Sequence, residues 1–489
     1  MILYTAYGIF LLNLEQITEY RYSVTDAKRM TYMKKLQYFF ALYAAKASQS
    51  LLKLLGRNAT YFPGKVAISL CKNFLSFVTP PKTVIAVTGT NGKTTVSNLI
   101  TSILIENGYS VTNNSFGSNI AAGVISALIE DMTLSGKPKK DIAVLEVDER
   151  SSLLIYPQLK PDYLVCNNIM RDSIKRNAHT EFISYIITEA LPFSTKLIVN
   201  ADDLIAARLG NNEQPRIYFG IEAERPDTVK PQHIRDIVYC PECGEQLKDE
   251  YVRYNHIGRH YCDACGLKSP EADYAVTDID RENSTFTIRH HEKEEVFTLI
   301  NDNIVNVYNF CGVIALLNEF GMSYDQIKKG FTQSKIVKTR LDEAKSGDLN
   351  ITMIMAKGQN PIACARCYDY VAKSPSVQKG AIVFVDDVAD NTHNSETTCW
   401  LYDCDYAAFA DPNIKQVIFA GPRCHDHYLR ALLAGVDPAK ISITMESSEA
   451  VALLDTNICK DIFVLHELYR PDEAKMIKEE LIARGKGGC

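Results

Sequence analysis

Short apolar runs alternate with longer segments of helical spacing through the first half of the chain, which is typical of buried strands joined by helices. The first run is followed by a helix predicted over Thr94–Asn107. The predicted strands of this half are Thr83–Val87, Asp141–Val147, Asp162–Cys166 and Lys196–Asn200. Strands that alternate with helices in this way predict an α/β fold, in which helices cover both faces of a parallel sheet.

The pattern changes at about residue 224 and starts afresh at about residue 346. Residues 235–272 carry paired cysteines and polar strands such as Ser284–His290 follow, so we predict an insertion into the α/β domain, which resumes near Phe297. Later apolar runs predict a second, separate α/β domain, with the strands Asn350–Met355, Ala381–Val385, Gln416–Ala420 and Asp461–Leu465. The expected domains of this 489-residue chain are therefore residues 1–55, 56–345 and 346–489.

The N-terminal part of the chain is expected to be a helical extension. Residues 36–56 carry apolar side chains at helical spacing. The stretch Ile2–Leu14 is apolar but short, and no Lys or Arg precedes it as in a signal peptide. We therefore expect residues 1–35 to form an extra amphipathic helix or to be an extension upstream of the true translation start. Met30 and Met33 are alternative initiators.

Composition and charge narrow the class of protein. The chain is 46% apolar and 23% charged, which is typical of a globular protein. Its net charge of −6 gives no basic field that would attract nucleic acid. It contains no apolar run of 18 residues, which argues against a spanning helix. Fourteen cysteines without an export signal indicate a reducing compartment, and we expect the cytoplasm.

A glycine loop directly follows the first predicted strand and opens the first predicted helix. Phosphate oxygens need backbone N–H groups and a helix N-terminus aimed at them, and glycine lets the backbone come close. Lys93 is placed to reach the terminal phosphates, and Thr94 to bind Mg²⁺. A plain glycine turn would not need the Lys-Thr-Thr that follows. The residues predicted to hold ATP are Gly89, Thr90, Asn91, Gly92, Lys93, Thr94 and Thr95.

Glu146 is the candidate carboxylate for the magnesium ion. It lies at the end of the predicted strand Asp141–Val147, where carboxylates of parallel-sheet ATPases reach Mg²⁺. Asp148 and Glu149 follow closely and are alternatives. A solvated acidic turn without a metal is the other interpretation.

Four cysteines form two C-x₂-C pairs, which predict a zinc ribbon. Gly244 and Gly266 directly follow the pairs, so each pair is expected on a tight turn. Four thiolates leave no open position on Zn²⁺, which makes the predicted ion structural. Incidental thiols and a nucleic-acid-binding ribbon are the alternatives, and the second lacks basic surroundings. The predicted ligands are Cys240, Cys243, Cys262 and Cys265.

Two further groups of potential ligands are interpreted as structural. Cys364 and Cys367 have no matching second pair, so we expect packed helix positions. Cys424, His425 and His427 are expected to be surface polar residues at a strand end.

These motifs together resemble the Mur ligase superfamily, and within it the MurT family. The four-cysteine ribbon separates that family from ordinary Mur ligases, and the resemblance covers roughly residues 37–475. It implies a Mur ligase-type P-loop ATPase domain with a zinc-ribbon insertion and a C-terminal MurT-type domain. The segments that carry it, besides the glycine loop and Glu146, are residues 56–67, 114–119, 200–203 and 306–309 and the pair Arg171-Asp172.

The resemblance implies an ATP-dependent carbon–nitrogen ligase of peptidoglycan biosynthesis. MurT-type subunits convert the D-glutamate carboxylate of lipid II to an acyl phosphate, which ammonia from a GatD-like glutaminase subunit displaces within a heterodimer. The resemblance implies nucleotide contacts at Asn306, whose segment fits the family pattern, and at Arg340, whose segment only approximates it. In this family the ligase subunit also supplies an Asp, which orients the histidine of the partner's catalytic Cys–His pair. Asp390 matches that segment, and Glu396 is the nearest carboxylate that replaces a displaced acid. Reaching lipid II implies a peripheral approach to the membrane.

The chain also departs from the family pattern. Residues 389–403 contain an insertion, and Lys175 stands where the family has an acid. These changes leave open a paralogue with another substrate or partner, an amino-acid ligase of the Mur or folylpolyglutamate type, or an ATP-binding scaffold without turnover.

Overall fold

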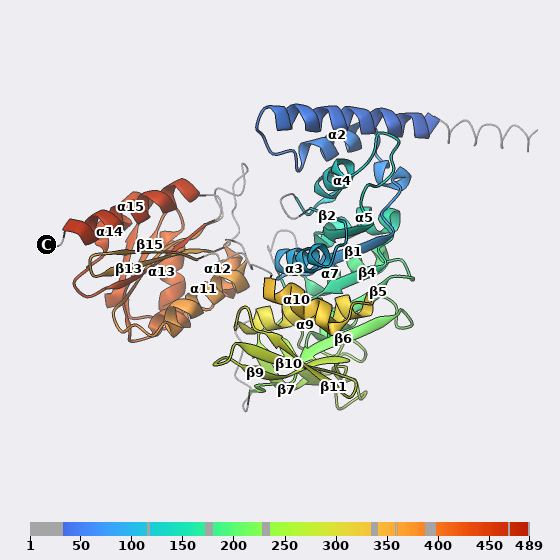
Figure 1. Cartoon of the computed structure of the whole chain (residues 1–489). Coiled ribbons are helices and arrows are strands. Elements are labelled where there is room, and N and C mark those ends of the chain that lie inside the picture. Colours follow the sequence, from blue (N-terminus) through green and yellow to red (C-terminus); the bar gives the residue numbers. More distant parts are fainter. Residues whose placement is uncertain are drawn as a thin grey trace, which may run out of the picture.

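A computed structural model describes residues 33–114, 118–171, 179–226, 235–333, 341–356, 358, 360–386, 398–467 and 470–487. Its strands form a nine-stranded sheet, a six-stranded sheet and a two-stranded ribbon (Figure 1). The predicted α/β class is confirmed. Within the described ranges, no helix combines the length and apolar content needed to cross a bilayer.

The nine-stranded sheet is parallel over most of its width and antiparallel at one edge. Its order is β11-β10-β9-β6-β5-β4-β1-β3-β2, and only the pairs that involve β10 are antiparallel. Every residue of β3 is buried, as expected for a strand with helices on both faces. The strands are β1 Thr83–Thr88, β2 Val111–Asn113, β3 Ile142–Glu146, β4 Tyr163–Cys166, β5 Lys196–Asn200, β6 Arg216–Ile221, β9 Tyr274–Asp280, β10 Thr285–His290 and β11 Lys293–Thr298.

The polar strand predicted over Ser284–His290 is not part of the insertion. It is β10, which pairs with β9 in the main sheet, and β9 lies parallel to β6. The inserted ribbon is the separate hairpin of β7 (Lys248–Tyr254) and β8 (Ile257–Tyr261). The prediction failed because a polar edge strand resembles an excursion from the core when only its own sequence is considered.

Two helical layers cover the nine-stranded sheet. Side chains alternate along β1, so that Val84 and Ala86 face one layer while Ile85 and Val87 face the other. The helix of residues 33–54 and α2, α4, α5, α7 and α8 lie on the first side, and α3, α9 and α10 on the second. The helices are α2 Phe62–Leu70, α3 Lys93–Glu106, α4 Ala121–Glu130, α5 Ser152–Leu159, α7 Thr180–Ala190, α8 Leu204–Ala207, α9 Ile304–Glu319 and α10 Tyr324–Gln333.

The C-terminal part of the chain builds the six-stranded sheet, with order β12-β13-β17-β14-β15-β16 and a core on each face. It lies beside the first sheet and is orange to red in Figure 1. All four strands predicted here are found. The elements are β12 Leu341–Ser346, β13 Leu349–Met355, α11 Pro361–Lys373, β14 Lys379–Phe384, α12 Cys399–Asp403, β15 Ile414–Ala420, α13 Cys424–Leu433, β16 Ile441–Thr444, α14 Ala450–Leu453, β17 Asp461–His466 and α15 Pro471–Gly487.

Five short 3₁₀ turns complete the described elements. They are η1 Phe74–Phe77, η2 Glu149–Ser151, η3 Ala407–Ala410, η4 Pro438–Lys440 and η5 Ser447–Glu449. Of these, η2 matters most for the site, because it follows β3 and carries an acid back toward the glycine loop.

The contact between α2 and α4 gives a stability prediction. A Cβ added to Gly64 of α2 would overlap the backbone carbonyl of Ala122 in α4, which cannot move without shifting the helix. We expect Gly64→Ala to lower the free energy of unfolding by about 2–3 kcal/mol or more, because the helices must separate. Ser69→Ala, at an exposed position of the same helix, is expected to change it by less than about 0.5 kcal/mol. Urea unfolding of both variants tests this, and equal effects would contradict the close contact.

Candidate nucleotide site and metal centre

The turn from β1 into α3 requires glycine at two positions. Gly89 and Gly92 have φ values of 114° and 93°, in the left-handed region that favours glycine. A Cβ on Gly89 would lie 2.8 Å from the carbonyl oxygen of Asn168, and a Cβ on Gly92 would overlap the side chain of Asn309. The backbone is therefore left bare at the N-terminus of α3, where N–H groups and the helix dipole favour a phosphate.

The segment that follows β4 accepts hydrogen bonds from the glycine loop and so fixes its position. The N–H of Thr90 donates to the carbonyl of Asn168 (2.9 Å), and that of Asn91 donates to the Asn168 side chain (2.9 Å). The hydroxyl of Thr90 donates to the carbonyl of Met170 (2.9 Å). The motif alone did not indicate this support, although a strand that ends in asparagines is visible in the sequence.

Lys93, the first residue of α3, forms a buried ion pair. Its Nζ lies 2.8 Å from Oε1 of Glu149 and 2.6 Å from the carbonyl oxygen of Gly89. Burial raises the pKa of Glu149 above its usual range, and the Lys93 ammonium opposes that shift. The ammonium group is thus held against the backbone of the glycine loop, a position from which a cation can offset the charge of a bound phosphate.

Glu146 and Thr94 lie side by side at the carboxyl end of β3. The Thr94 hydroxyl donates to Oε2 of Glu146 (2.8 Å), and Asn119 donates to Oε1 (3.1 Å). Asn114 fixes the backbone of Glu146 by bonding to both its N–H (2.8 Å) and its carbonyl (2.9 Å). A hydroxyl and a carboxylate held together next to a phosphate-binding loop are a suitable donor set for Mg²⁺.

Asn306 connects to the loop through a chain of amides. It lies in the first turn of α9 and accepts a hydrogen bond from Asn309 (3.1 Å), whose oxygen accepts one from Asn167. Gly92 packs against both Asn309 and Asn167. The predicted residue Asn306 is thus brought to the site, whereas Thr95 lies on α3 beyond the loop.

Several predicted residues lie outside the described residues. They are Arg340, Asp390, Glu396, Asp172 and Lys175.

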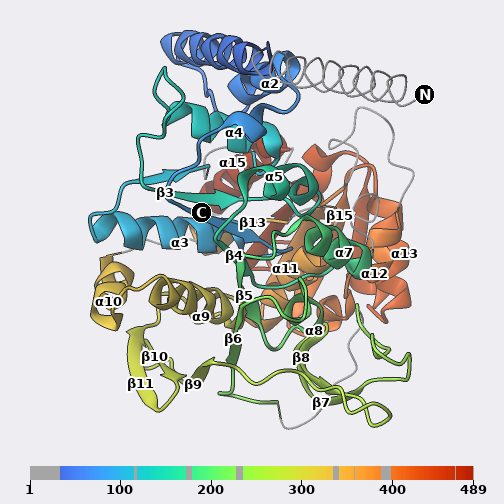
Figure 2. The same ribbon diagram turned by 90° about the vertical axis from the view of Figure 1, so that its right-hand side faces the viewer.

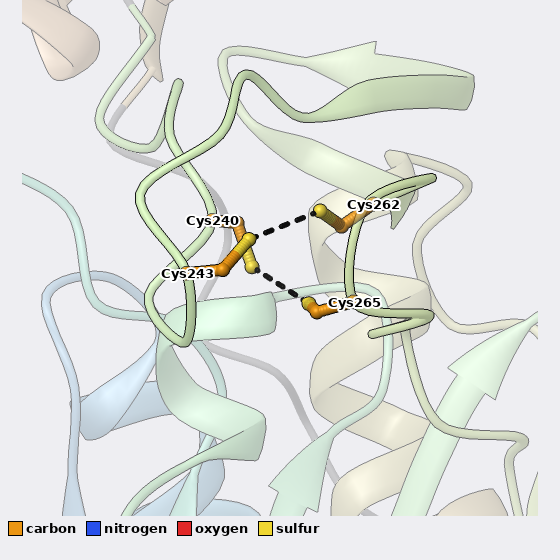
Figure 3. Close-up of side chains that lie close together, drawn as sticks. All are labelled: Cys240, Cys243, Cys262 and Cys265. Atoms are coloured by element: carbon orange, nitrogen blue, oxygen red, sulfur yellow. Dashed lines mark hydrogen bonds between the residues drawn. The ribbon is translucent and has the colours of Figure 1, made fainter.

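The four cysteines of the ribbon converge (Figure 3). The sulfurs of Cys240 and Cys265 are 3.5 Å apart, as are those of Cys243 and Cys262, and all four lie within 4.8 Å of one another. Tetrahedral zinc with Zn–S bonds of about 2.3 Å needs sulfurs about 3.8 Å apart, so the geometry fits zinc. The four residues can therefore hold a metal ion.

The two halves of this centre have the same backbone geometry. Gly244 and Gly266 both have φ of 77°, and each donates its N–H to the carbonyl of the first cysteine of its pair, at 2.9 and 3.0 Å. Each pair therefore lies on a tight turn, as the sequence predicted.

A buried polar network that the sequence analysis missed ties the ribbon to both sheets. His256, between β7 and β8, lies 3.2 Å from Oδ1 of Asp203 and 3.6 Å from Oδ2 of Asp236. Burial lowers the pKa of His256, but the two carboxylates outweigh it and hold the pKa above its usual value. Asp236 also pairs with Arg171, which reaches Asp403 of α12 (3.2 Å). Asp203, Arg171 and Asp403 lie in segments that carried the family resemblance, whereas His256 and Asp236 do not.

A cavity of about 330 Å³ lies between the N-terminal helical segment and α4. Lys53 and Arg57 line one part of it, and Asn113 and Asn114 another. Because Asn114 also holds Glu146, the cavity adjoins the proposed magnesium side of the nucleotide site.

The remaining cysteine and histidine predictions have mixed outcomes. Cys364 is buried and Cys367 half-buried in α11, so packed helix positions are confirmed. Cys424 and His427 are not surface residues, because both are buried in α13. His427 bonds to the hydroxyl of Tyr406 (2.5 Å) and the carbonyl of Val385 (2.7 Å). Burial lowers its pKa to about 4, so it is a neutral core residue. Its position between polar neighbours hid this in the sequence.

Two protein-family models match different parts of the chain. Residues 87–260 match the family model "Mur ligase middle domain", and residues 358–468 match "MurT ligase C-terminal". The lipid II isoglutaminyl synthase (glutamine-hydrolyzing) subunit MurT of Staphylococcus aureus (strain COL) is 30% identical over 402 residues, covering 81% of this chain and 88% of that protein. The protein of the same name from Streptococcus pneumoniae is 28% identical, covering 87% and 93%.

Solved structures agree on the fold. A pseudomurein peptide ligase type C from Methanothermus fervidus superposes with a TM-score of 0.61 at 22% identity, covering 84% of this chain and 81% of that one. MurF from Acinetobacter baumannii gives 0.58 at 15% identity, covering 86% and 80%. The fold is thus that of the Mur ligases. Together with the relatives above, this shows that the chain belongs to the MurT family of the Mur ligase superfamily.

Proposed function

We propose that this chain is the ATP-dependent ligase subunit of an amidotransferase that converts the D-glutamate carboxylate of lipid II to its amide. The relatives that match most of the chain are named for this reaction. The observation that carries the proposal is the bare backbone of the glycine loop, with Lys93 behind it and the Thr94–Glu146 pair beside it.

The reaction has two steps. A carboxylate oxygen of the substrate attacks the γ-phosphorus of ATP, and ADP leaves. Ammonia then attacks the acyl carbon, phosphate leaves, and a proton is lost to give the amide. The first step needs charge compensation more than acid–base chemistry, because phosphoryl transfer depends mainly on positioning and electrostatics.

The residues of the site match that need. We propose that the loop from Gly89 to Thr95 binds the phosphates of ATP, with Asn306 and Arg340 as further nucleotide contacts. Lys93 is placed to offset charge on the transferred phosphoryl group. Mg²⁺ would be held by Thr94 and Glu146 and would supply positive charge that offsets the charge of the phosphates. The cavity beside Asn114 is where we place the acyl end of the substrate.

The domain division expected from the sequence is part of the proposal. We propose residues 1–55 as a helical extension, 56–345 as the ATPase domain with the ribbon at about 235–272, and 346–489 as the C-terminal domain. Zn²⁺ in the ribbon has a structural role, because four sulfurs complete its coordination. The ribbon then keeps His256 in place against Asp203 and Asp236.

Ammonia is proposed to come from a GatD-like glutaminase subunit. Asp390 or Glu396 would orient the partner's catalytic histidine, as the third member of a Cys–His–acid triad does. This division of labour predicts that the chain alone uses free ammonium but not glutamine.

The test of the proposal is amidation in a defined mixture. Purified chain, ATP, Mg²⁺, lipid II and an ammonium salt are expected to replace the carboxyl OH by NH₂, as detected by mass spectrometry. Replacing ammonium with amino acids separates this activity from an amino-acid ligase. Addition of an amino acid, or no ATP consumption with any amine, would contradict the proposal.

Lys93→Ala is expected to lower the amidation rate by about 10²-fold or more, because it removes the cation that offsets charge on the transferred phosphoryl group. Lys82→Ala is the matched control, since Lys82 is exposed at the opposite end of β1. Initial rates of ADP release measure both. The unfolding midpoint is recorded alongside, because Glu149 loses its buried partner. A normally folded Lys93→Ala protein with unchanged turnover would show that the loop is not catalytic.

Cys262→Ser is expected to reduce bound zinc from about one ion per chain to near zero, since it removes one of four ligands. Loss of the ion should also speed hydrogen exchange across residues 235–272, because the ribbon is a small hairpin. Cys399→Ser, at an exposed cysteine of α12, is the control and should retain the ion. Elemental analysis of both proteins decides, and zinc-free wild-type protein would refute the metal assignment.

Asp390→Asn is expected to slow glutamine-dependent amidation by the complex by at least about 10²-fold, because a triad acid sets the histidine tautomer. Amidation with ammonium salt should be unchanged, since the ATP site is intact. Glu396→Gln, measured in the same two assays, shows which carboxylate acts. Loss of both activities in Asp390→Asn would point to a role outside the glutaminase reaction.

A further inference from the structure

The helix of residues 33–54 carries an apolar stripe that no described part of the chain covers. Its exposed members are three, four or eight residues apart, which places them on one face of a helix with about 3.6 residues per turn. Phe40 is 63% exposed and Leu54 85%. We define the outer stripe as Met33, Leu36, Phe40, Tyr43, Leu51 and Leu54.

The opposite face of the same helix already supplies the core. Tyr38, Leu42 and Ala45 are buried against α4 and the η1 turn, and Lys46 bonds to the carbonyl of Ile129 at the end of α4 (2.7 Å). The helix lies along the edge of the molecule in both views (Figures 1 and 2). Packing among the described residues therefore does not explain the outer stripe. A large exposed apolar face of this kind marks a contact with something else.

The charge of this region is the second observation. Residues 33–72 contain seven Lys or Arg side chains and no Asp or Glu, although the chain as a whole carries a net charge of −6. Lys34, Lys35, Arg57 and Lys65 are exposed, and no ion pair is recorded for them among the described residues. An apolar helix face flanked by unopposed cations is the pattern of helices that lie in the interface of an anionic membrane.

We propose that the outer stripe docks this chain on the surface of an anionic lipid bilayer, with the helix lying parallel to the membrane plane. The proposal rests on the proposed function, because lipid II is itself held in a membrane. Apolar side chains of the stripe would enter the acyl boundary, while the lysines beside it extend to the lipid phosphates.

The position of the cavity agrees with this orientation. Lys53 and Arg57, at the C-terminal end of the helix, line the cavity that reaches Asn114 beside Glu146. A docked helix would therefore bring the entrance of the site close to the headgroup layer. The membrane-bound substrate could then present its carboxylate while its lipid tail stays in the bilayer.

Vesicle sedimentation tests the proposal with the full chain. The wild-type protein is expected to bind phosphatidylglycerol vesicles at least about 10-fold more tightly than phosphatidylcholine vesicles, and to be released by high salt, because cations near the surface are screened. Phe40→Glu with Leu51→Glu should reduce binding at least about 10-fold, since two apolar side chains that would enter the bilayer become charged. Val377→Glu with Leu433→Glu adds the same charges at exposed apolar positions of the C-terminal part and should bind normally.

Four outcomes would overturn the proposal. They are no binding to either vesicle, equal binding to both lipids, unchanged binding of the Phe40/Leu51 variant, and loss of binding when only residues 1–32 are removed. A wild-type dimer that the same variant converts to monomer would show instead that a second copy covers the stripe.

Amidation of a water-soluble precursor by the Phe40/Leu51 variant keeps this test apart from the proposed function. Normal amidation together with lost vesicle binding supports docking. Wild-type vesicle binding without amidation of any precursor would reject the function and leave the docking result standing.

Discussion

The passage of the chain from β1 into α3 is the constraint on which the site depends. Gly89 and Gly92 both adopt left-handed backbone conformations, and neighbouring asparagines occupy the space that a side chain would need. β1 lies between β4 and β3 in the parallel part of the sheet. Asn167 and Asn168 directly follow β4, and Asn309 comes from α9. The N-terminus of α3 and the Lys93 ammonium therefore lie at the same turn.

Buried charge is the second feature that shapes the site. Glu149 is only 3% exposed, and its pKa is raised by burial despite the ion pair with Lys93. The ion pair between Lys93 and Glu149 keeps the lysine side chain in the low-dielectric interior, away from solvent. Its charge is therefore held at a fixed position beside the glycine loop, as the proposed role in phosphoryl transfer requires.

Among the described residues, one polar network joins the ribbon and the C-terminal sheet to this site. His256 of the ribbon contacts Asp203 and Asp236, and Asp236 shares Arg171 with Asp403. Arg171 directly follows Met170, whose backbone holds the hydroxyl of Thr90 in the glycine loop. These contacts connect the ribbon and the C-terminal sheet, which are distant in sequence, to the glycine loop.

The sequence alone determined the features that arise from local order. Alternating apolar runs predicted β1, α3 and the main strands, and the glycine-lysine spacing predicted the tight turn between β1 and α3. Glycine after each cysteine pair predicted two tight turns, which both form. Each of these depends on neighbours a few residues away, so the residue pattern contains the information.

Only the tertiary structure decided which distant groups meet. It paired Lys93 with Glu149 and Thr94 with Glu146, whereas the sequence offered three acids at that strand end. It also placed β10 in the main sheet and buried His427 in the C-terminal core, against expectation. These outcomes depend on strand order and helix packing across long separations in the chain, and local hydrophobic periodicity does not encode them.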